Sequence, residues 1–285
     1  MSWVIYHTFE RYFGLAKKRE LKLAEAVTSN DLETVKKLLN LGVDPNLRIV
    51  GQHREPIIFL CFEKSWFTLP LAKIGDRAKK SYQITAKLEC LRLLLEHGAK
   101  PDLRDSLGRT ALEMAIVWCL PEVVKLLLLY GAEPNLRDAK GQTPLIKAAI
   151  LGIQDARPMQ HKIKIMIDLL DSGAEIDAQT PDGRTALMYA VGHLRLEIVK
   201  FLVSNGASLT ICDRQGNQAK DIISRSSAIQ QQRYLYQILN QPQVNLSKSE
   251  YREYVPEGDR QLAPIIKREN LKERDFDYLS RRWEN

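Results

Sequence analysis

Residues 94–112 read LLEHGAKPDLRDSLGRTAL, and residues 127–145, 33 positions later, read LLLYGAEPNLRDAKGQTPL. Both stretches place two leucines ahead of a glycine, Leu-Arg-Asp in the middle, and a threonine followed two residues later by leucine. A pattern that returns with its glycine in register indicates one structural unit used several times. Such units bury their apolar faces by stacking on their neighbours, so the sequence predicts a solenoid.

The glycine-terminated ending recurs five times along the chain. The intervals between successive glycines are 56, 33, 42 and 33 residues, so two repeats are longer than the basic period. The extra residues predict insertions near 65–86, between the two helices of the second repeat, and near 153–161. The glycines that define the period are Gly42, Gly98, Gly131, Gly173 and Gly206.

Each unit also carries the signals that begin and end helices. Thr110, Thr143 and Thr185 each follow a glycine by two residues, and threonine is a favourable N-cap. Pro144 suits the first helical position, and the glycine after each second helix suits a left-handed cap. Apolar residues at helical spacing, such as the stripe 126–129, are expected to form the core. The predicted unit is a helix, a turn, a second helix and a hairpin-like loop.

The unit start, Asp-x-x-Gly-x-Thr-Pro/Ala-Leu, and its end, Leu-Leu-x-x-Gly-Ala-x-Pro-Asn, resemble the ankyrin repeat. The resemblance covers roughly residues 23–240. It implies an all-α ankyrin-repeat solenoid of about five helix-turn-helix units with hairpin-like loops, closed by a C-terminal cap at residues 213–222. It also implies a non-enzymatic adaptor or scaffold that binds another protein. The histidine of the family's Thr-Pro-Leu-His motif is not shared, because its positions hold Ile58, Glu113, Ile146 and Met188.

Two segments flank the repeats. Residues 1–22 combine aromatic and basic side chains and are predicted to form a capping helix, with contact to a membrane surface or a partner helix as the alternative. Residues 241–285 carry nine basic and nine acidic side chains. In this polar arm, Phe276, Leu279 and Trp283 have the spacing of a short docking helix, although the low apolar content is equally consistent with disorder.

Ankyrin modules bind partners through their loop tips and first helices, so the resemblance places the candidate site there. Two arginine rows emerge at equivalent repeat positions, and repeats stacked about 10 Å apart would align them as a basic ladder. A guanidinium fits a carboxylate or a phosphate, which predicts recognition of an acidic protein segment with Trp118 as an aromatic anchor. The candidate binding residues are Arg48, Arg54, Arg104, Leu107, Arg109, Trp118, Arg137, Lys140, Gln142, Arg184 and, in the first insertion, Trp66.

Two alternatives compete with this hypothesis. Asp105 and Asp138 directly follow Arg104 and Arg137, and they would neutralise these arginines within the loops. Exposed pairs of this kind contribute only about 0–1 kcal/mol. The aromatic residues of the first insertion, Trp66 among them, would pack over the helices instead of facing a partner.

Composition narrows the functional classes. A net charge of +7 spread over 285 residues is a weak nucleic-acid signal. The five histidines are scattered, and no phosphate loop, metal-ligand spacing or nucleophile–base motif is present. The four cysteines form no Cys-x-x-Cys pair, which favours thiols buried as small hydrophobic groups in a reducing compartment. We therefore expect no catalytic residue, metal or cofactor, and a cytoplasmic location without a signal peptide or membrane span.

Three other functions remain open at this point. The chain could be a bacterial effector or adaptor delivered to a host cell through a C-terminal address. It could bind nucleic acid through the arginine ladder, which requires affinity that falls steeply with salt. It could also hold a small enzyme in its tail, although about 45 residues can hardly build an active site alone.

Overall fold

The computed structural model of the 285-residue chain describes residues 18–49, 55–62, 88–150, 159–223, 235 and 238–239. The chain divides into two compact units, residues 1–245 and 246–285, and every described residue belongs to the first. Several sequence predictions lie outside the described residues. They are the capping residues 1–17, Arg54, the first insertion with Trp66, and the arm 241–285.

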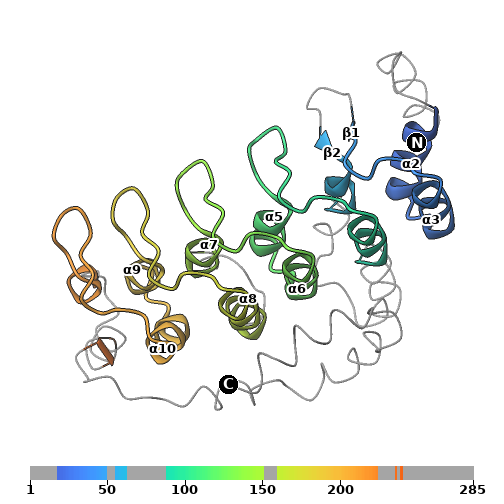
Figure 1. The fold of residues 1–285 in the computed structure, drawn as a ribbon. Coiled ribbons are helices and arrows are strands. Elements are labelled where there is room, and N and C mark those ends of the chain that lie inside the picture. Colours follow the sequence, from blue (N-terminus) through green and yellow to red (C-terminus); the bar gives the residue numbers. More distant parts are fainter. Residues whose placement is uncertain are drawn as a thin grey trace, which may run out of the picture. The chain divides into compact units, whose positions relative to one another are not determined.

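Within the first unit the helices follow one another in pairs (Figure 1). The second pair differs because its first member is a 3₁₀ helix, η1 (Ile57–Phe62), followed by a helix over residues 88–96. A short 3₁₀ helix, η4 (Ala219–Ile222), follows the fifth pair. This architecture confirms the predicted all-α class. The other pairs are α2 (Lys18–Ser29) with α3 (Leu32–Asn40), α5 (Ala111–Val117) with α6 (Pro121–Leu129), α7 (Pro144–Ile150) with α8 (Met159–Asp171), and α9 (Ala186–Gly192) with α10 (Leu196–Ser204).

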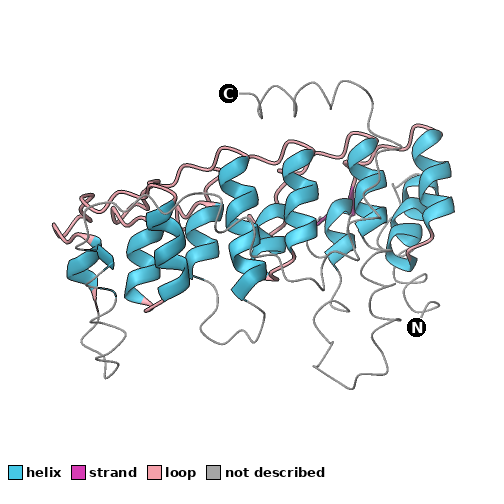
Figure 2. Cartoon of the chain, turned by 90° about the horizontal axis from the view of Figure 1, so that it is seen from below, coloured by secondary structure: helices cyan, strands magenta, loops and turns pink. Residues whose placement is uncertain are grey.

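The pairs pack side by side so that like helices meet. Among the first helices, η1 contacts α2 and α5, α7 lies against both α5 and α9, and α9 contacts η4. Among the second helices, α8 contacts α6 and α10. The connecting loops run along one edge of these two helical layers (Figure 2). Each unit therefore buries its apolar faces against its neighbours, as the repeat pattern predicts.

The predicted helix signals are present in the structure. Thr110 Oγ1 accepts a hydrogen bond from the Glu113 N–H at 3.1 Å, and Thr185 Oγ1 accepts one from the Met188 N–H at 3.3 Å. Pro144 is the first residue of α7. All five period-defining glycines have positive φ, between 79° and 92°. The residues that mark the repeat in the sequence therefore mark its helix ends in space.

The core follows the periodic leucines with one exception. Leu127 is fully buried and Leu126 is nearly so, but Leu129, in the same predicted stripe, is 52% exposed. Its place on the outward face of α6 corrects the expectation that the whole stripe is core. The positions of the missing motif histidine are filled in two ways: Ile58, Ile146 and Met188 join the core, whereas Glu113 forms an ion pair.

Some boundaries differ from the predicted ones. Helix α2 begins at Lys18, so its first turn includes residues assigned from sequence to the capping segment. Helix α8 begins at Met159, within the range of the second predicted insertion. Two-residue strands, β1 (Arg48–Ile49) and β2 (Glu55–Pro56), pair antiparallel in the loop before η1. None of the described helices has both the length and the apolar content needed to cross a bilayer.

Candidate interaction surface

Four successive loops share one hydrogen-bonded turn. In each, the N–H of the first turn residue donates to the carbonyl four positions later, at 2.9 to 3.0 Å. The first side chain then accepts N–H groups from within the turn; Asp105 Oδ1, for example, accepts from Leu107 and Arg109 at 2.9 and 2.7 Å. The loop tips are therefore held by their own hydrogen bonds. The turn pairs are Asp105 with Arg109, Asp138 with Gln142, Thr180 with Arg184, and Asp213 with Asn217.

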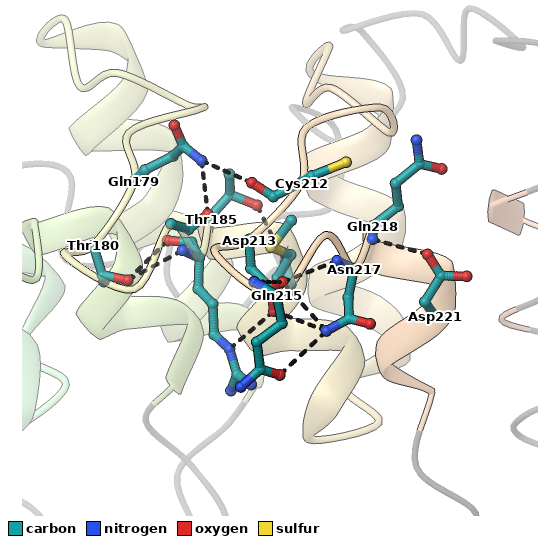
Figure 3. A network of polar contacts seen from close by, with 12 residues as sticks. Gln179, Thr180, Thr185, Cys212, Asp213, Gln215, Asn217, Gln218 and Asp221 are labelled. Carbon is teal, nitrogen blue, oxygen red and sulfur yellow. Dashed lines mark hydrogen bonds and ion pairs between the residues drawn. The ribbon is translucent and has the colours of Figure 1, made fainter.

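One repeat position connects each loop to the next, and we call its residues, Arg48, Arg104, Arg137 and Gln179, the arginine row. Arg48 Nη1 donates to the Arg104 carbonyl at 3.1 Å, and Arg104 Nη2 donates to the Arg137 carbonyl at 2.9 Å. Arg137 Nη1 donates to the Gln179 carbonyl at 2.6 Å, and Gln179 Nε2 donates to the Cys212 carbonyl at 3.2 Å. The last contact is drawn in Figure 3. The three arginines of one predicted row therefore follow one another from loop to loop, and each of them also contacts the next loop.

The same side chains also donate hydrogen bonds within their own turns. Arg104 Nη1 donates to the Gly108 carbonyl at 2.6 Å, and Arg137 Nη1 donates to the Gly141 carbonyl at 2.8 Å. Gln179 Nε2 makes the equivalent bond to the Gly183 carbonyl at 2.7 Å. A neutral amide thus performs the structural role of a guanidinium, so this position requires a donor of sufficient reach and does not require a positive charge.

The neighbouring carboxylates do not neutralise the row, contrary to the alternative drawn from sequence. Asp105 instead binds Arg109, whose Nε and Nη2 both lie 2.7 Å from Asp105 Oδ2. Adjacent residues of an extended loop point in opposite directions, which separates Asp105 from Arg104 despite their adjacency in sequence. Among the described residues, neither Arg104 nor Arg137 forms an ion pair with a carboxylate.

Asp138, the other carboxylate in question, pairs with Lys147 of α7. Lys147 Nζ lies 2.7 Å from Asp138 Oδ2 and also contacts Glu113 Oε1 of the preceding repeat. Burial raises the pKa of Asp138, but hydrogen bonds from Lys147 and from the Gln142 N–H outweigh it and hold that pKa below its ordinary value. Sequence analysis missed this cluster, although Glu113 at the position of the motif histidine was a signal for it.

The remaining predicted residues occupy different parts of the surface. Leu107, at the tip of the loop that precedes α5, is 68% exposed. Lys140 is exposed at the tip of the loop that precedes α7. Gln142 is half-buried at the base of that loop. Arg184 Nε lies 3.7 Å from Asp213 Oδ2 of the following loop.

Trp118 lies away from the loop tips. It is the C-cap of α5, at the opposite end of that helix from Thr110. Its ring packs against Phe62 of the preceding repeat, with centroids 5.7 Å apart at 58°. The structure therefore separates the proposed aromatic anchor from the arginine row.

Sequence analysis also missed a second set of contacts between repeats, which we call the Asx row: Asn46, Asp102, Asn135 and Asp177. Each accepts a backbone N–H from the next repeat; the Lys100 N–H, for example, donates to Asn46 Oδ1 at 2.7 Å. The two asparagines also donate, Asn46 to the Gly98 carbonyl and Asn135 to the Gly173 carbonyl, both at 3.0 Å. Recurrence of Asn or Asp four residues after four of the period-defining glycines was the available signal.

The cysteines divide into two groups. Cys61, Cys90 and Cys119 are buried, as predicted, whereas Cys212 is exposed, which corrects the expectation for that residue. All four thiols are free. In the described part of the chain, no three His, Cys, Asp or Glu side chains gather in the manner of metal ligands.

The sequence matches a known protein family. A family described as "Ankyrin repeats (3 copies)" matches residues 81–138 and 119–213. The matched residues contain the third, fourth and fifth helix pairs and the loops that carry Arg104, Arg137 and Gln179. Repeats of this family generally act in protein–protein interaction and are generally not enzymes.

Proposed function

Since this chain is an ankyrin-repeat protein, we propose that it is a non-enzymatic interaction module that binds an acidic segment of a partner protein along its loop edge. The residues assigned to this contact are Arg48, Arg104 and Arg137 of the arginine row, with Leu107 and Lys140 at the neighbouring tips. The observation that carries the proposal is that neither Arg104 nor Arg137 forms an ion pair with a carboxylate of the described residues, although Asp102 interacts electrostatically with Arg104.

The hydrogen bonds of the row support the proposal in a second way. Because Arg104 and Arg137 each donate to two backbone carbonyls, their side chains are already ordered before a partner arrives. Immobilising a long side chain on binding costs about 0.5–1.5 kcal/mol, and this cost is largely avoided here. The exposed Leu107 adds an apolar contact beside the charges.

The setting that we propose is a reducing compartment, and we place the protein in the cytoplasm. Its four free thiols, one of them exposed at Cys212, are compatible with that location.

The test uses a variant that the protein itself suggests. Replacing Arg104 and Arg137 with glutamine reproduces the chemistry of Gln179, which makes the same two kinds of backbone contact without a charge. We expect the double variant to fold like the parent and to bind a fluorescein-labelled deca-glutamate peptide about tenfold more weakly. Fluorescence anisotropy measures the affinity, and circular dichroism confirms the fold.

The matched control removes two positive charges elsewhere. Lys36 and Lys37 are exposed on α3, and changing both to glutamine alters the net charge by the same amount. We expect this variant to retain the affinity of the parent. Equal losses in the two double variants would mean that only net charge matters, and they would overturn the proposed site.

A further inference from the structure

The tips of the four hydrogen-bonded loops carry side chains of four different kinds. We call the residues two positions after the start of each turn the tip row: Leu107, Lys140, Asp182 and Gln215. All four are exposed. Each turn is closed by the backbone, because the N–H of the glycine after the tip residue donates to the first carbonyl of the turn at 2.8 to 3.1 Å. The fold therefore holds each tip in place without specifying its side chain.

Leu107 is the tip residue that its turn explains least. Gly, Pro, Asn, Asp and Ser dominate turns, so a leucine at this point has no local structural reason. It is the most exposed of three large apolar side chains that are exposed in the described part of the chain. The other two, Leu41 and Leu129, lie at helix ends. An exposed leucine on a turn that is already ordered gains free energy when a partner covers it.

The next two tips carry opposite charges. Within the described residues, neither Lys140 nor Asp182 takes part in an ion pair. Arg214 of the following loop lies close, since its N–H donates to the Asp182 carbonyl at 3.0 Å, but its guanidinium forms no ion pair with the Asp182 carboxylate. Charges placed in a fixed order select a partner with complementary charges in the same order, because like charges that face each other repel.

The stacked repeats set the distance between the tips. Side chains of the arginine row join each of these loops to the next, and the loops follow one another in the order of the helix pairs (Figure 1). Packed helices lie about 8–10 Å apart, and an extended chain advances about 3.3 Å per residue. About three residues of an extended partner segment therefore span one step from tip to tip.

We propose that the partner segment lies extended across three loop tips and presents an apolar residue to Leu107, an acidic residue to Lys140 and a basic residue to Asp182, about three residues apart. This inference rests on the proposed function, because the central acidic residue is the one that Arg137 and Lys140 recognise. It adds the order of residue types on either side of that acidic residue. Both chain directions satisfy the order, since the acidic residue lies in the middle.

The first test compares three labelled peptides of identical composition on the full-length chain. Each peptide contains the blocks Leu-Leu-Ser, Glu-Glu-Ser and Lys-Lys-Ser. The matched peptide has the acidic block in the middle, and the other two peptides have the apolar or the basic block there. We expect the matched peptide to bind about fivefold more tightly than either of the others, as measured by fluorescence anisotropy.

The second test exchanges the two charged tips. The double variant Lys140→Glu, Asp182→Lys keeps the net charge of the protein, and both side chains are exposed, so we expect the fold to be retained in circular dichroism. The tips then read apolar, acidic, basic. We expect the peptide with the basic block in the middle to become the tightest of the three, by about fivefold.

The apolar contact has its own variant and a matched control. Leu107→Ser should weaken the matched peptide about threefold, because the apolar block loses the surface that covers it. Leu129→Ser changes another exposed leucine, at the end of α6, and should leave the affinity unchanged. Equal losses in the two variants would remove Leu107 from the contact and overturn the proposed order.

The failure of this inference can be told apart from the failure of the proposed function. If the three peptides bind equally well and all weaken in the Arg104→Gln, Arg137→Gln double variant, the order is overturned while the proposed function stands. A preference that does not follow the exchange of Lys140 and Asp182, or no measurable binding of the matched peptide, also overturns the order. If no acidic peptide, deca-glutamate included, responds to the arginine double variant, the proposed function itself fails.

Discussion

The arginine row and the Asx row occupy positions two residues apart in the same loops, yet they hold the repeats together by opposite means. The arginine row donates hydrogen bonds to carbonyls of the next loop, as Arg104 does to Arg137. The Asx row accepts N–H groups from the next repeat, as Asp102 does from Glu133. Together the two rows satisfy both kinds of backbone group at each junction.

The difference between the rows shows which property each position fixes. The arginine row contains both Arg and Gln, so it fixes a donor and leaves the charge open. The Asx row contains both Asn and Asp, so it fixes an acceptor and leaves the charge open there also. Charge on the loop edge is therefore independent of the structural role of these positions. Substitutions that change this charge can change the binding specificity without altering the fold.

The largest expected loss of stability comes from a glycine at which two successive loops lie close together. Gly183 has φ +78°, and a Cβ atom there would lie 2.9 Å from the Arg214 nitrogen of the next loop. We expect Gly183→Ala to lower the free energy of unfolding by about 3 kcal/mol, from backbone strain together with this clash. Urea denaturation measures the change.

The control is Gly108, the equivalent glycine in the loop that precedes α5. Gly108 has φ +76° and nothing within 4 Å of its Cβ position, so Gly108→Ala should cost only the strain, about 1 kcal/mol. Equal losses at the two glycines would mean that the loops do not constrain each other.

The next largest effect on stability comes from Asp168, a half-buried residue outside both rows. Asp168 of α8 faces Glu122 and Lys125 of α6, and its Oδ2 is buried without a hydrogen-bond partner. Burial raises the pKa of Asp168 to about 6, against the pull of Lys125 and Lys164 and with the help of Glu122 and Asp171. The ionised form is therefore disfavoured in the folded state.

The sign of the pH dependence follows from the raised pKa. The cost of ionising Asp168 is fully present above pH 7 and is lost as the pH falls through 6 toward its ordinary pKa of 3.8. We expect Asp168→Asn to raise the free energy of unfolding by about 2 kcal/mol at pH 8 and to have almost no effect at pH 4. A gain that is the same at both pH values would contradict this account.

The donor requirement of the arginine row is tested at Arg137. Arg137→Ala removes the bonds to the Gly141 and Gln179 carbonyls, and we expect a loss of about 1 kcal/mol because water replaces part of each exposed bond. Arg137→Gln should recover most of that loss. Thermal or urea unfolding of the three proteins decides the point, and equal stability of the alanine and glutamine variants would refute the donor requirement.

The smallest effect distinguishes the two residue types of the Asx row. Asn46 and Asn135 each make a donor bond that the ionised Asp102 lacks. Burial raises the pKa of Asp102, and the charge of Glu133 adds to this. Asp102→Asn should stabilise the fold by about 0.5–1 kcal/mol at neutral pH, and the gain should shrink as the pH falls through the pKa of Asp102. The reverse change, Asn135→Asp, should destabilise the fold; a neutral result in both would remove the distinction.

The repeat itself could be predicted from sequence because its determinants are local and periodic. Thr110 and Thr185 cap helices that begin one residue later, and the glycines end helices within the same unit. The alignment of Arg48, Arg104 and Arg137 followed from their shared position six residues after a period-defining glycine. These features need no knowledge of which groups face each other across a junction.

The partners of these residues could not be predicted, because a backbone carbonyl has no sequence identity. The target of Arg104 is the carbonyl of Arg137, and any residue at that position would supply one. Adjacency in sequence suggested Asp105 as the partner of Arg104, although the side chain that reaches Asp105 is Arg109. The equivalence of Gln179 to the arginines could not be predicted for the same reason, since it is visible only in the two contacts of Gln179.

Cys212 occupies the fifth position of the arginine row, and its thiol points back to the Thr210 carbonyl of its own loop at 3.6 Å. A thiol is too short to reach the carbonyl of a following loop, as an amide or a guanidinium does. The series of hydrogen bonds along the arginine row therefore ends at Cys212. A protein engineer who wished to lengthen this array should therefore splice new units between the fourth and fifth pairs. A unit appended after Cys212 would meet a surface where this position has no side chain able to donate a hydrogen bond to its loop.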